Sequence, residues 1–247
     1  MNEIISTLHA RKSMRVFEDK PVSVETRNAI IEAAMAAPSA GCQQMYSIIQ
    51  ITDQSVKDKL AKSCDNQPFI ATAPLVLIFC SDMQKWYDAF LLAGAEPRLP
   101  GSGDLALAMQ DTVIAAQNAV TAADSLGLGS CYIGDMLEHC EYHRELLHLP
   151  AYVLPATMLV IGYPTEQQKN RPKPPRCTVA DILHENAYQP YDRQRLEALY
   201  ACKTDGDFDG FMQRFCARKY NSDFSREMSR SVDKYLTAYA SYLDETE

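Results

Sequence analysis

The sequence predicts an α+β fold, a layered α/β arrangement with a helical C-terminal part. Three apolar runs have the length and composition of buried strands, at 46–52, 74–80 and 153–162. Helical patterns separate these runs, and a charged helical pattern extends from residue 192 to the end. Strands that alternate with helices form a sheet covered by helices, so we expect a layered domain.

The N-terminal helices are predicted from residues that typically begin and end helices. One helix is expected over residues 2–9. A second begins at Ser23 and ends near residue 37, before a proline, and a third begins at Asp53 and ends near residue 62. Serine and aspartate are good N-caps because their side-chain oxygens accept hydrogen bonds from the first free amides of a helix.

The segment 105–126 predicts a helix that is apolar on almost every side. A helix without a polar face is buried in a large core or at an interface, so we expect a central helix or one at a subunit contact. A glycine turn and a short apolar piece follow at 127–135. Residues 163–177 are rich in proline and basic residues, and we expect an exposed connection there.

Composition excludes several classes of protein. The chain has 247 residues, with 24 Lys and Arg against 32 Asp and Glu, and its net charge of −8 disfavours nucleic acid as a partner. No apolar run has the length of a membrane span, and the first residues lack the order of a signal peptide. The eight cysteines form no CxxC pair, as expected of free thiols in a reducing cytoplasm.

Two short segments could bind a ligand. Residues Arg11, Lys12, Ser13 and Arg15 place three cations and a hydroxyl within five positions, which suits a phosphate, although a solvated charged turn has the same composition. The loop 38–44 (PSAGCQQ) has small residues that let a ligand approach the backbone, although it is also typical of an ordinary loop between a helix and a strand.

Other motifs give weaker signals. His139 and His143 are four residues apart around Cys140, a spacing that could hold a metal on one helix face, but the HExxH order is missing and a solvated helix is the simpler expectation. The glycines at 127–134 do not fit a dinucleotide fingerprint, and no GxSxG elbow exists. Without an obvious side-chain catalyst, the chain is either a binding module or an enzyme whose cofactor carries the chemistry.

Five segments, taken in order, resemble the FMN-dependent nitroreductase family, in particular its NADPH-dependent oxygen-insensitive nitroreductase and flavin reductase branch. They are RKSMR at residues 11–15, APSAGCQQ at 37–44, Gln67, GLGSCYIGD at 127–135, and the tail KPPR…HENAY at 173–188. The resemblance implies a mixed sheet flanked by helices, in an intertwined homodimer with FMN at the interface. It further implies an FMN-binding domain at 1–190, a helical extension at 191–247 packed on the same domain, and a role for 105–126 as the central dimer helix.

The resemblance also implies which residues hold FMN, whereas no catalytic side chain is expected. Arg11, Ser13 and Arg15 would bind the phosphate and ribityl chain, and Lys12 would contact the flavin by its backbone. Ser39 and Gln44 would line the pocket, and Gln67 would approach the ribityl chain or the ring edge. Cys131, Tyr132, Ile133 and Gly134 would lie against the ring. Lys173 and Arg176 would complete the phosphate site. Two departures from the family pattern are Cys42, where asparagine is usual, and the spacing Lys173-Pro-Pro-Arg176, for which Arg171 could compensate.

The function implied is two-electron, ping-pong hydride transfer from NAD(P)H through FMN to nitroaromatics, quinones or free flavin, in a cytoplasmic enzyme. Arg214, Arg218 and Lys219 could hold the 2′-phosphate of NADPH, although a solvated helix face fits them as well, so the donor stays open. Two alternatives remain. One is a flavin-binding module with little turnover, motivated by Cys42. The other is a metal-binding or interaction protein that uses His139, Cys140 and His143.

Overall fold

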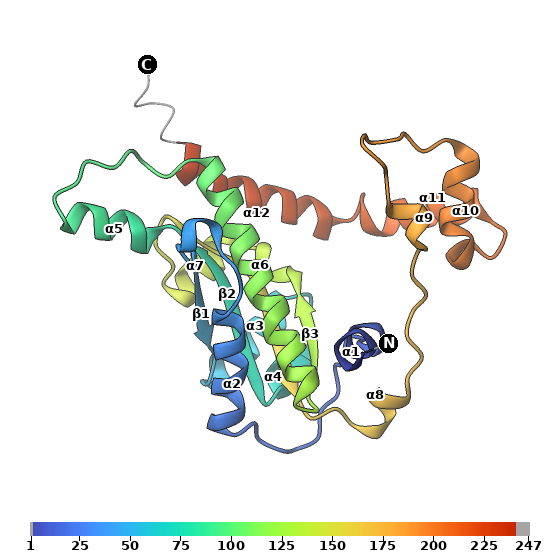
Figure 1. Ribbon diagram of the computed structural model, residues 1–247, viewed down its shortest axis with the longest axis horizontal. Coiled ribbons are helices and arrows are strands. Elements are labelled where there is room, and N and C mark those ends of the chain that lie inside the picture. Colours follow the sequence, from blue (N-terminus) through green and yellow to red (C-terminus); the bar gives the residue numbers. More distant parts are fainter. Residues whose placement is uncertain (1, 241–247) are drawn as a thin grey trace. The chain divides into compact units, whose positions relative to one another are not determined.

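A four-stranded sheet in the order β1-β2-β4-β3 forms the centre of the computed structural model, which describes residues 2–240 (Figure 1). The strands are β1 Tyr46–Gln50, β2 Leu75–Asp82, β3 Gly129–Ile133 and β4 Val153–Gly162. All three pairings between these strands are antiparallel. The α+β class is confirmed. The resemblance implied a mixed sheet, whereas the sheet of the described residues is antiparallel throughout.

The central strands β2 and β4 are buried along their whole length. Leu75, Leu77 and Phe79 point to one face of the sheet, and Val76 and Ile78 point to the other. Antiparallel strands often alternate between apolar and polar residues because one face meets water. Here both faces are covered by helices, which explains why the strands read as continuous apolar runs.

Helices α2 (Val24–Met35) and α6 (Ser102–Ser125) cover the face that carries Leu77 and Phe79 (Figure 1). Small residues dominate the buried side of α6, including Ala108, Ala115, Ala116, Ala119 and Ala123, and let the helix approach the sheet closely. The opposite side of α6 leaves Leu107, Val113 and Ile114 between 40% and 45% exposed. The prediction of an apolar helix is confirmed, but a single chain buries only part of it.

The other face of the sheet packs against α3 (Gln54–Ser63), α4 (Pro68–Thr72), the short helix η2 (Gly134–Leu137) and α7 (Cys140–Leu147). As predicted, the side chains of Ser23 and Asp53 accept hydrogen bonds from the first amides of α2 and α3. Helix α1 (Glu3–Ala10) has no buried residue among those described. Helix α5 (Gln84–Leu92), which the sequence analysis did not predict, follows β2 directly.

The C-terminal part contains α8 (Glu166–Asn170), α9 (Val179–Ile182), α10 (Arg193–Thr204), α11 (Phe208–Lys219) and α12 (Asp223–Ala240). The chain forms two compact units, of which the smaller is Pro172–Arg226 and the larger contains the remaining described residues. The division into residues 1–190 and 191–247 stays a prediction. No described helix is long and apolar enough to cross a membrane.

The larger unit also includes the end of α12, where Tyr235 and Tyr239 are buried in a cluster with Met45, Tyr152 and other residues. The Tyr239 hydroxyl donates to the carbonyl of Tyr152 over 2.9 Å. These residues attach the end of the described chain to the sheet near the start of β1 and β4.

Gly129 allows the N-terminal segment to lie against β3, and we predict that Gly129→Ala destabilises the fold. A Cβ at this position would lie 2.5 Å from Cγ and 2.8 Å from Cβ of Met14, close to the backbone, where Met14 cannot simply rotate away. Overpacking of this kind costs about 1–3 kcal/mol. Urea unfolding measures the loss. Gly103→Ala is the matched control, because nothing lies within 4 Å of its Cβ, and an equal effect of both variants would contradict the prediction.

Candidate functional site

The segment 11–15 is fixed between the edge strand β3 and the residues around α8. It leaves α1 at Arg11, whose amide donates to the carbonyl of Thr7. The amide of Met14 then donates to the carbonyl of Ser130 on β3 over 2.9 Å, and Phe17 forms a β-bridge with Pro164. These backbone contacts hold the segment along β3, so it is not the free solvated turn that its composition also allowed.

The side chains of Lys12 and Arg171 join this segment to α8. The Lys12 ammonium donates to the carbonyl of Lys169 over 2.6 Å and to that of Arg171. In return, the Arg171 guanidinium donates to the carbonyl of Ser13 over 2.5 Å. The amide of Arg15 donates to Oε1 of Gln168 over 3.2 Å, and Gln168 is buried. The expectation of a wholly exposed connection over 163–177 is therefore wrong at α8, where a glutamine faces inward to satisfy a backbone donor.

Arg11 and Arg15 are the cations of the segment that these contacts do not use. Their guanidinium groups lie 5.8 Å from the ring centres of Tyr132 and Phe69 respectively. Neither forms an ion pair with any carboxylate in residues 2–240. Each of them is therefore a cation beside an aromatic ring with no ion pair in residues 2–240, and such a group favours an anion.

Buried polar atoms without partners gather along the same segment. Five such side-chain atoms occur in the described part of the chain, and three of them are Nε of Arg11, Oγ of Ser130 and Oγ1 of Thr165. The backbone of Met14 is hydrogen-bonded to that of Ser130, and the backbone of Val16 to that of Thr165. The three atoms without partners therefore belong to Arg11 and to residues beside the same stretch of backbone. Buried polar groups are normally paired, and a bound polar ligand is one explanation for such a cluster.

Burial changes the pKa of two acidic groups near Arg11, Tyr132 and Asp124. Burial raises the pKa of Tyr132 to about 12, and the positive charge of Arg11 opposes this increase. Burial likewise raises the pKa of Asp124 to about 6, again opposed by Arg11. The Tyr132 hydroxyl donates to Oε1 of Gln117 on α6 over 3.3 Å.

The residues at the end of β3 differ in how exposed they are. Cys131 and Ile133 are each 1% exposed and pack among the core residues facing α3 and α4. Tyr132 points to the opposite face of the sheet. Nothing lies within 4 Å of a Cβ built on Gly134, so this position leaves open space beside the chain. A ligand at this edge would reach Tyr132 and Gly134, because Cys131 and Ile133 are buried.

Gln67 lies near this edge and is held by two acceptors. Its side-chain amide donates to the carbonyl of Cys64 over 2.9 Å and to Oδ2 of Asp135 over 3.0 Å. Asp135 in turn lies near Glu138, which is 4% exposed. Burial, followed by the negative charges of Asp135, Asp65 and Glu227, raises the pKa of Glu138 to about 7.

Ser39 and Gln44 lie away from these groups within one chain. They belong to the loop before β1, at the opposite edge of the sheet from β3. Three strand spacings separate the edges by roughly 14 Å. Tyr46 lies opposite Ser81 of β2. Ser130 lies opposite Ile161 of β4, which itself lies opposite Leu75 of β2. Because Ser81 and Leu75 are far apart on β2, the start of β1 and the segment at Ser130 also differ by roughly 20 Å along the strands. The structure thus gathers Arg11, Ser13, Arg15, Gln67 and β3, but does not bring Ser39 and Gln44 to them.

Asp111 and Gln168 are polar residues near predicted site segments that the sequence analysis missed. Asp111 accepts hydrogen bonds from the backbone of the loop before β1. A signal was present, because Asp111 is the only charged residue between positions 105 and 123, in the middle of an apolar helix. Gln168 had no comparable signal in its polar surroundings.

The histidines of α7 have structural partners. His143 is 0% exposed, and its Nδ1 lies 3.2 Å from the carbonyl of Met136 while Nε2 lies 2.8 Å from Oγ of Ser63. Since a carbonyl only accepts, Nδ1 carries the hydrogen and Nε2 accepts from Ser63. Burial lowers the pKa of His143, which favours this neutral form. The expectation of a solvated helix is wrong for His143 and Cys140, because both turn into the core.

A metal site at these histidines has no geometric support. His139 lies 3.3 Å from Glu227, and both ring nitrogens of His143 are already used. Among residues 2–240, no three His, Cys, Asp or Glu side chains are placed to hold a metal ion.

Lys173 and Arg176, like Arg214, Arg218 and Lys219, belong to the smaller unit. Arg176 is exposed, and Arg214 forms an ion pair with Asp207 at 3.0 Å. Arg218 lies 5.4 Å from the ring centre of Phe215. The HENAY tail forms a local aromatic cluster in which His184 stacks on Tyr188 at 5.0 Å.

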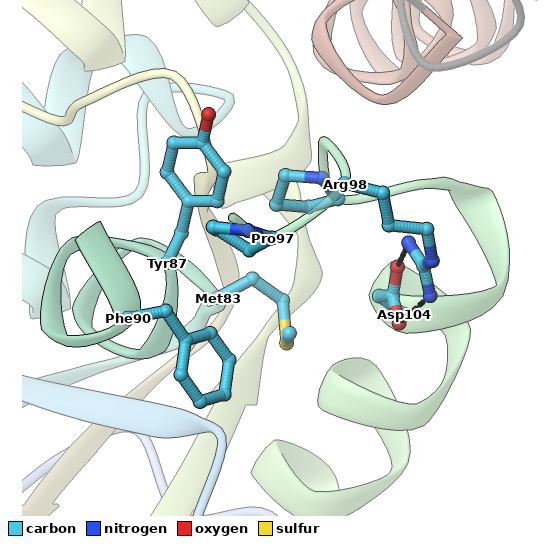
Figure 2. A pocket seen from close by; sticks show the side chains of 7 residues that line it. Met83, Tyr87, Phe90, Pro97, Arg98 and Asp104 are labelled. Carbon is cyan, nitrogen blue, oxygen red and sulfur yellow. Dashed lines mark hydrogen bonds and ion pairs between the residues drawn. The ribbon is translucent and has the colours of Figure 1, made fainter. Parts of the chain in front are cut away.

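Two surface cavities of the larger unit differ in their relation to the predicted residues. A groove of about 810 Å³ is lined by Arg15, Phe17, Lys57, Phe69 and neighbouring residues. A smaller pocket of about 210 Å³ lies between α5 and the start of α6 and is mostly apolar (Figure 2). At its rim Arg98 binds Asp104 through two hydrogen bonds of 2.6 and 3.0 Å, and no predicted site residue lines it.

The fold and the cations Arg11 and Arg15, which have no ion pair in residues 2–240, together define an α+β protein with a candidate site for an anionic ligand. A model of the nitroreductase family matches residues 8–163. The oxygen-insensitive NADPH nitroreductase of Salmonella typhimurium is 37% identical over 196 residues, 79% of each chain. The NAD(P)H-dependent FMN reductase of Bacillus subtilis is 31% identical over 246 residues, 95% of this chain and 91% of that protein.

A solved structure agrees with these sequence relatives. The NADPH:FMN oxidoreductase of Vibrio harveyi, complexed with NAD+, superposes with a TM-score of 0.79 at 26% identity, covering 95% of this chain and 98% of that one. The chain therefore belongs to the nitroreductase family. The family inferred from the five motifs is confirmed.

Glu138→Gln tests the buried carboxylate beside Asp135. The pKa of Glu138 is raised from an ordinary 4.5 to about 7 in the folded state. Between these two pH values the folded protein therefore keeps a proton on Glu138 that the unfolded chain loses. The contribution of protonated Glu138 to the free energy of unfolding is fully present below about pH 4.5 and is lost as the pH rises through about 7. Glutamine stays neutral throughout, so the variant should unfold at a higher temperature than the wild type near pH 8 and at nearly the same temperature near pH 5.

Thermal unfolding at the two pH values measures this difference, with the exposed Glu145→Gln on α7 as the control. A gain for Glu138→Gln that does not depend on pH would show that the charge of Glu138 is not the cause.

Proposed function

We propose that this chain is an FMN-dependent NAD(P)H oxidoreductase that passes two electrons, in ping-pong fashion, to nitroaromatics, quinones or free flavin. The observation that carries the proposal is that Arg11 and Arg15 have no counter-ion, and that neighbouring buried polar atoms have no partner, among residues 2–240. The relatives named as NADPH nitroreductase and FMN reductase support the same activity.

The residues present fit the FMN phosphate. A phosphate beside Arg11 and Arg15 would receive charge-assisted hydrogen bonds and would use the Nε of Arg11, which has no partner in residues 2–240. The Ser13 hydroxyl is a further donor in the same segment. Lys12 and Arg171 act differently, because their cationic groups already fix the backbone of residues 11–15 and 169–171. The participation of Lys173 and Arg176 is part of the proposal.

The flavin ring is proposed to lie beside residues 131–134, where Tyr132 is half-buried, Gly134 is exposed and nothing lies within 4 Å of a Cβ built on Gly134. When bound, FMN supplies the acceptance and donation of hydride. The chain binds and orients the ring, and Gln67, held by Asp135, is positioned to contact its edge. Arg11 and Arg15 would favour a negatively charged ligand, because they lie beside aromatic rings without counter-ions.

A homodimer completes the proposed site. The loop with Ser39 and Gln44 is at the opposite sheet edge from Arg11 and Arg15, so a ligand that contacts both sets requires two chains. The exposed apolar residues Leu107, Val113 and Ile114 on α6 give such a dimer an interface. A helix face of this kind is buried in the stable form of most proteins.

Two further statements complete the proposal. The enzyme works in the cytoplasm, in agreement with eight cysteines that all lack a disulfide partner. The hydride donor is NADPH or NADH. Arg214, Arg218 and Lys219 all contact neighbouring residues, so they do not identify a site for the 2′-phosphate that would distinguish the two donors.

An anaerobic absorption spectrum of the purified protein tests the function. We expect two flavin bands that bleach on addition of NADPH or NADH, and parallel titrations identify the preferred donor. Bands that persist with both donors would favour a flavin-binding module without turnover. A colourless protein that ignores added FMN would contradict the proposal.

Arg15→Ala should weaken FMN binding without unfolding the protein. A charge-assisted hydrogen bond contributes about 1.5–3 kcal/mol, so the dissociation constant should rise roughly 10- to 150-fold. Fluorescence titration of the flavin-free protein measures it. Arg27→Ala is the control, because Arg27 is an arginine on α2 that contacts Asn28 and Gln50 far from β3 along the sheet order. Equal affinities of wild type and Arg15→Ala would mean that Arg15 does not hold the phosphate.

Ile114→Arg should disrupt the dimer. It places a charge on the exposed apolar face of α6, where burial of an unpaired guanidinium is costly. Light scattering is expected to give twice the chain mass for the wild type and a lower mass for the variant. Exposed Gln54→Arg on α3 serves as the charge control. A monomeric wild-type protein would refute the proposed interface.

A further inference from the structure

The loop before β1, residues 39–45, has a backbone that needs support. Gly41, Cys42 and Gln44 have φ values of 56°, 57° and 49°, in the left-handed region. Glycine adopts this region freely, but cysteine and glutamine are strained there and stay in it only where other contacts hold them. Those contacts determine where Ser39 and Gln44 lie.

Asp111 on α6 supplies two of these contacts, one near each end of the loop. One carboxylate oxygen accepts a hydrogen bond from the amide of Ala40 over 2.9 Å, and the other accepts from the amide of Met45 over 3.2 Å. Asp111 is 3% exposed. A carboxylate is costly to bury unless its oxygens are paired, so the carboxylate and the loop depend on each other.

The other hydrogen bonds of the loop hold its interior. The amide of Gln44 donates to Oγ of Ser39 over 3.0 Å, and the side chain of Gln44 donates to the carbonyl of Met35 over 3.0 Å. The indole of Trp86 donates to the carbonyl of Gln43 over 2.9 Å. Among the side chains that contact this loop, Asp111 is the one that attaches it to α6 at both ends.

Helix α6 also carries the proposed dimer interface. Leu107 and Ile114 are exposed and lie about one turn before and after Asp111 along the helix. The carboxylate therefore fixes the loop relative to the helix that would meet the partner chain.

We propose that Asp111 is a positioning residue, which clamps the loop so that Ser39 and Gln44 are presented to the FMN held by Arg11 and Arg15 of the partner chain. The proposal rests on the function proposed above. It extends that function to a residue that would not touch the flavin and would act through the loop backbone.

Asp111→Asn tests the clamp with almost no change in shape. Asparagine offers one oxygen and one NH₂ group, and the NH₂ would face a backbone donor, so one of the two hydrogen bonds is lost. Thr112→Val is the matched control. Thr112 is also buried on α6, and its hydroxyl donates to the carbonyl of Ala108 within the helix over 2.6 Å and not to the loop.

Hydrogen–deuterium exchange of the FMN-free protein gives the first measurement. We expect the amides of residues 40–45 to exchange about tenfold faster or more in Asp111→Asn than in the wild type, and to be unchanged in Thr112→Val. The second measurement is FMN affinity by fluorescence titration, which should fall about tenfold in Asp111→Asn alone. The third is the visible circular dichroism of bound flavin, which should change in Asp111→Asn because the loop contacts the ring.

The outcomes separate this proposal from the one on which it rests. If the loop exchanges normally in Asp111→Asn, Asp111 is no clamp. If the loop loosens but FMN affinity and dichroism are unaffected, the clamp does not serve the flavin, and the positioning role is refuted. If the wild type itself binds no FMN, the proposed function has failed, the flavin-positioning role fails with it, and exchange alone reports whether Asp111 holds the loop.

Discussion

The pairing of β2 with β4 is the interaction on which the larger unit depends. These strands are joined from Leu75 opposite Ile161 to Asp82 opposite Val153, and neither leaves a residue exposed. Their alternating side chains form the base of both helical layers at once. The centre of the sheet is thereby filled with apolar groups, which leaves the outer strands as the place where polar side chains can meet a ligand.

Each outer strand has a polar segment next to it. An edge strand has backbone groups without a strand partner, and a protein covers or pairs them to prevent association with other chains. The segment 11–15 does this at β3 through the bond between Met14 and Ser130, and the loop 39–45 leads directly into β1. The groups proposed to hold FMN are therefore divided between two edges. Two copies of the chain are the simplest way to bring such groups together.

The parts of the fold that depend on nearby residues could be predicted from the sequence. The caps at Ser23 and Asp53 and the apolar runs of β1, β2 and β4 are properties of a few adjacent positions. Strand direction, the burial of His143 and the burial of Gln168 depend on residues far away in the sequence, so composition and spacing could not give them.

The same distinction applies to the candidate site. The motif at 11–15 identified cations, but the sequence could not tell which of them were free. Lys12 is bound to carbonyls of α8, whereas Arg11 and Arg15 have no counter-ion among the described residues, and this difference is set by a segment more than 150 positions later. The resemblance likewise named Ser39 and Gln44 without showing that one chain keeps them apart from Arg11.

Helix α6 connects the core to both features of the proposed dimeric site. Its alanines let it lie close to β2 and β4, so its position is determined by its packing on the buried centre of the sheet. Asp111 transmits that position to a loop at the sheet edge, and in the proposed dimer Leu107 and Ile114 would present it to the partner. A loop supported in this way takes its geometry from the core and not from its own sequence. This explains how Cys42 and Gln44 can remain in a strained conformation, and why the one carboxylate in the middle of an apolar helix stands where it does.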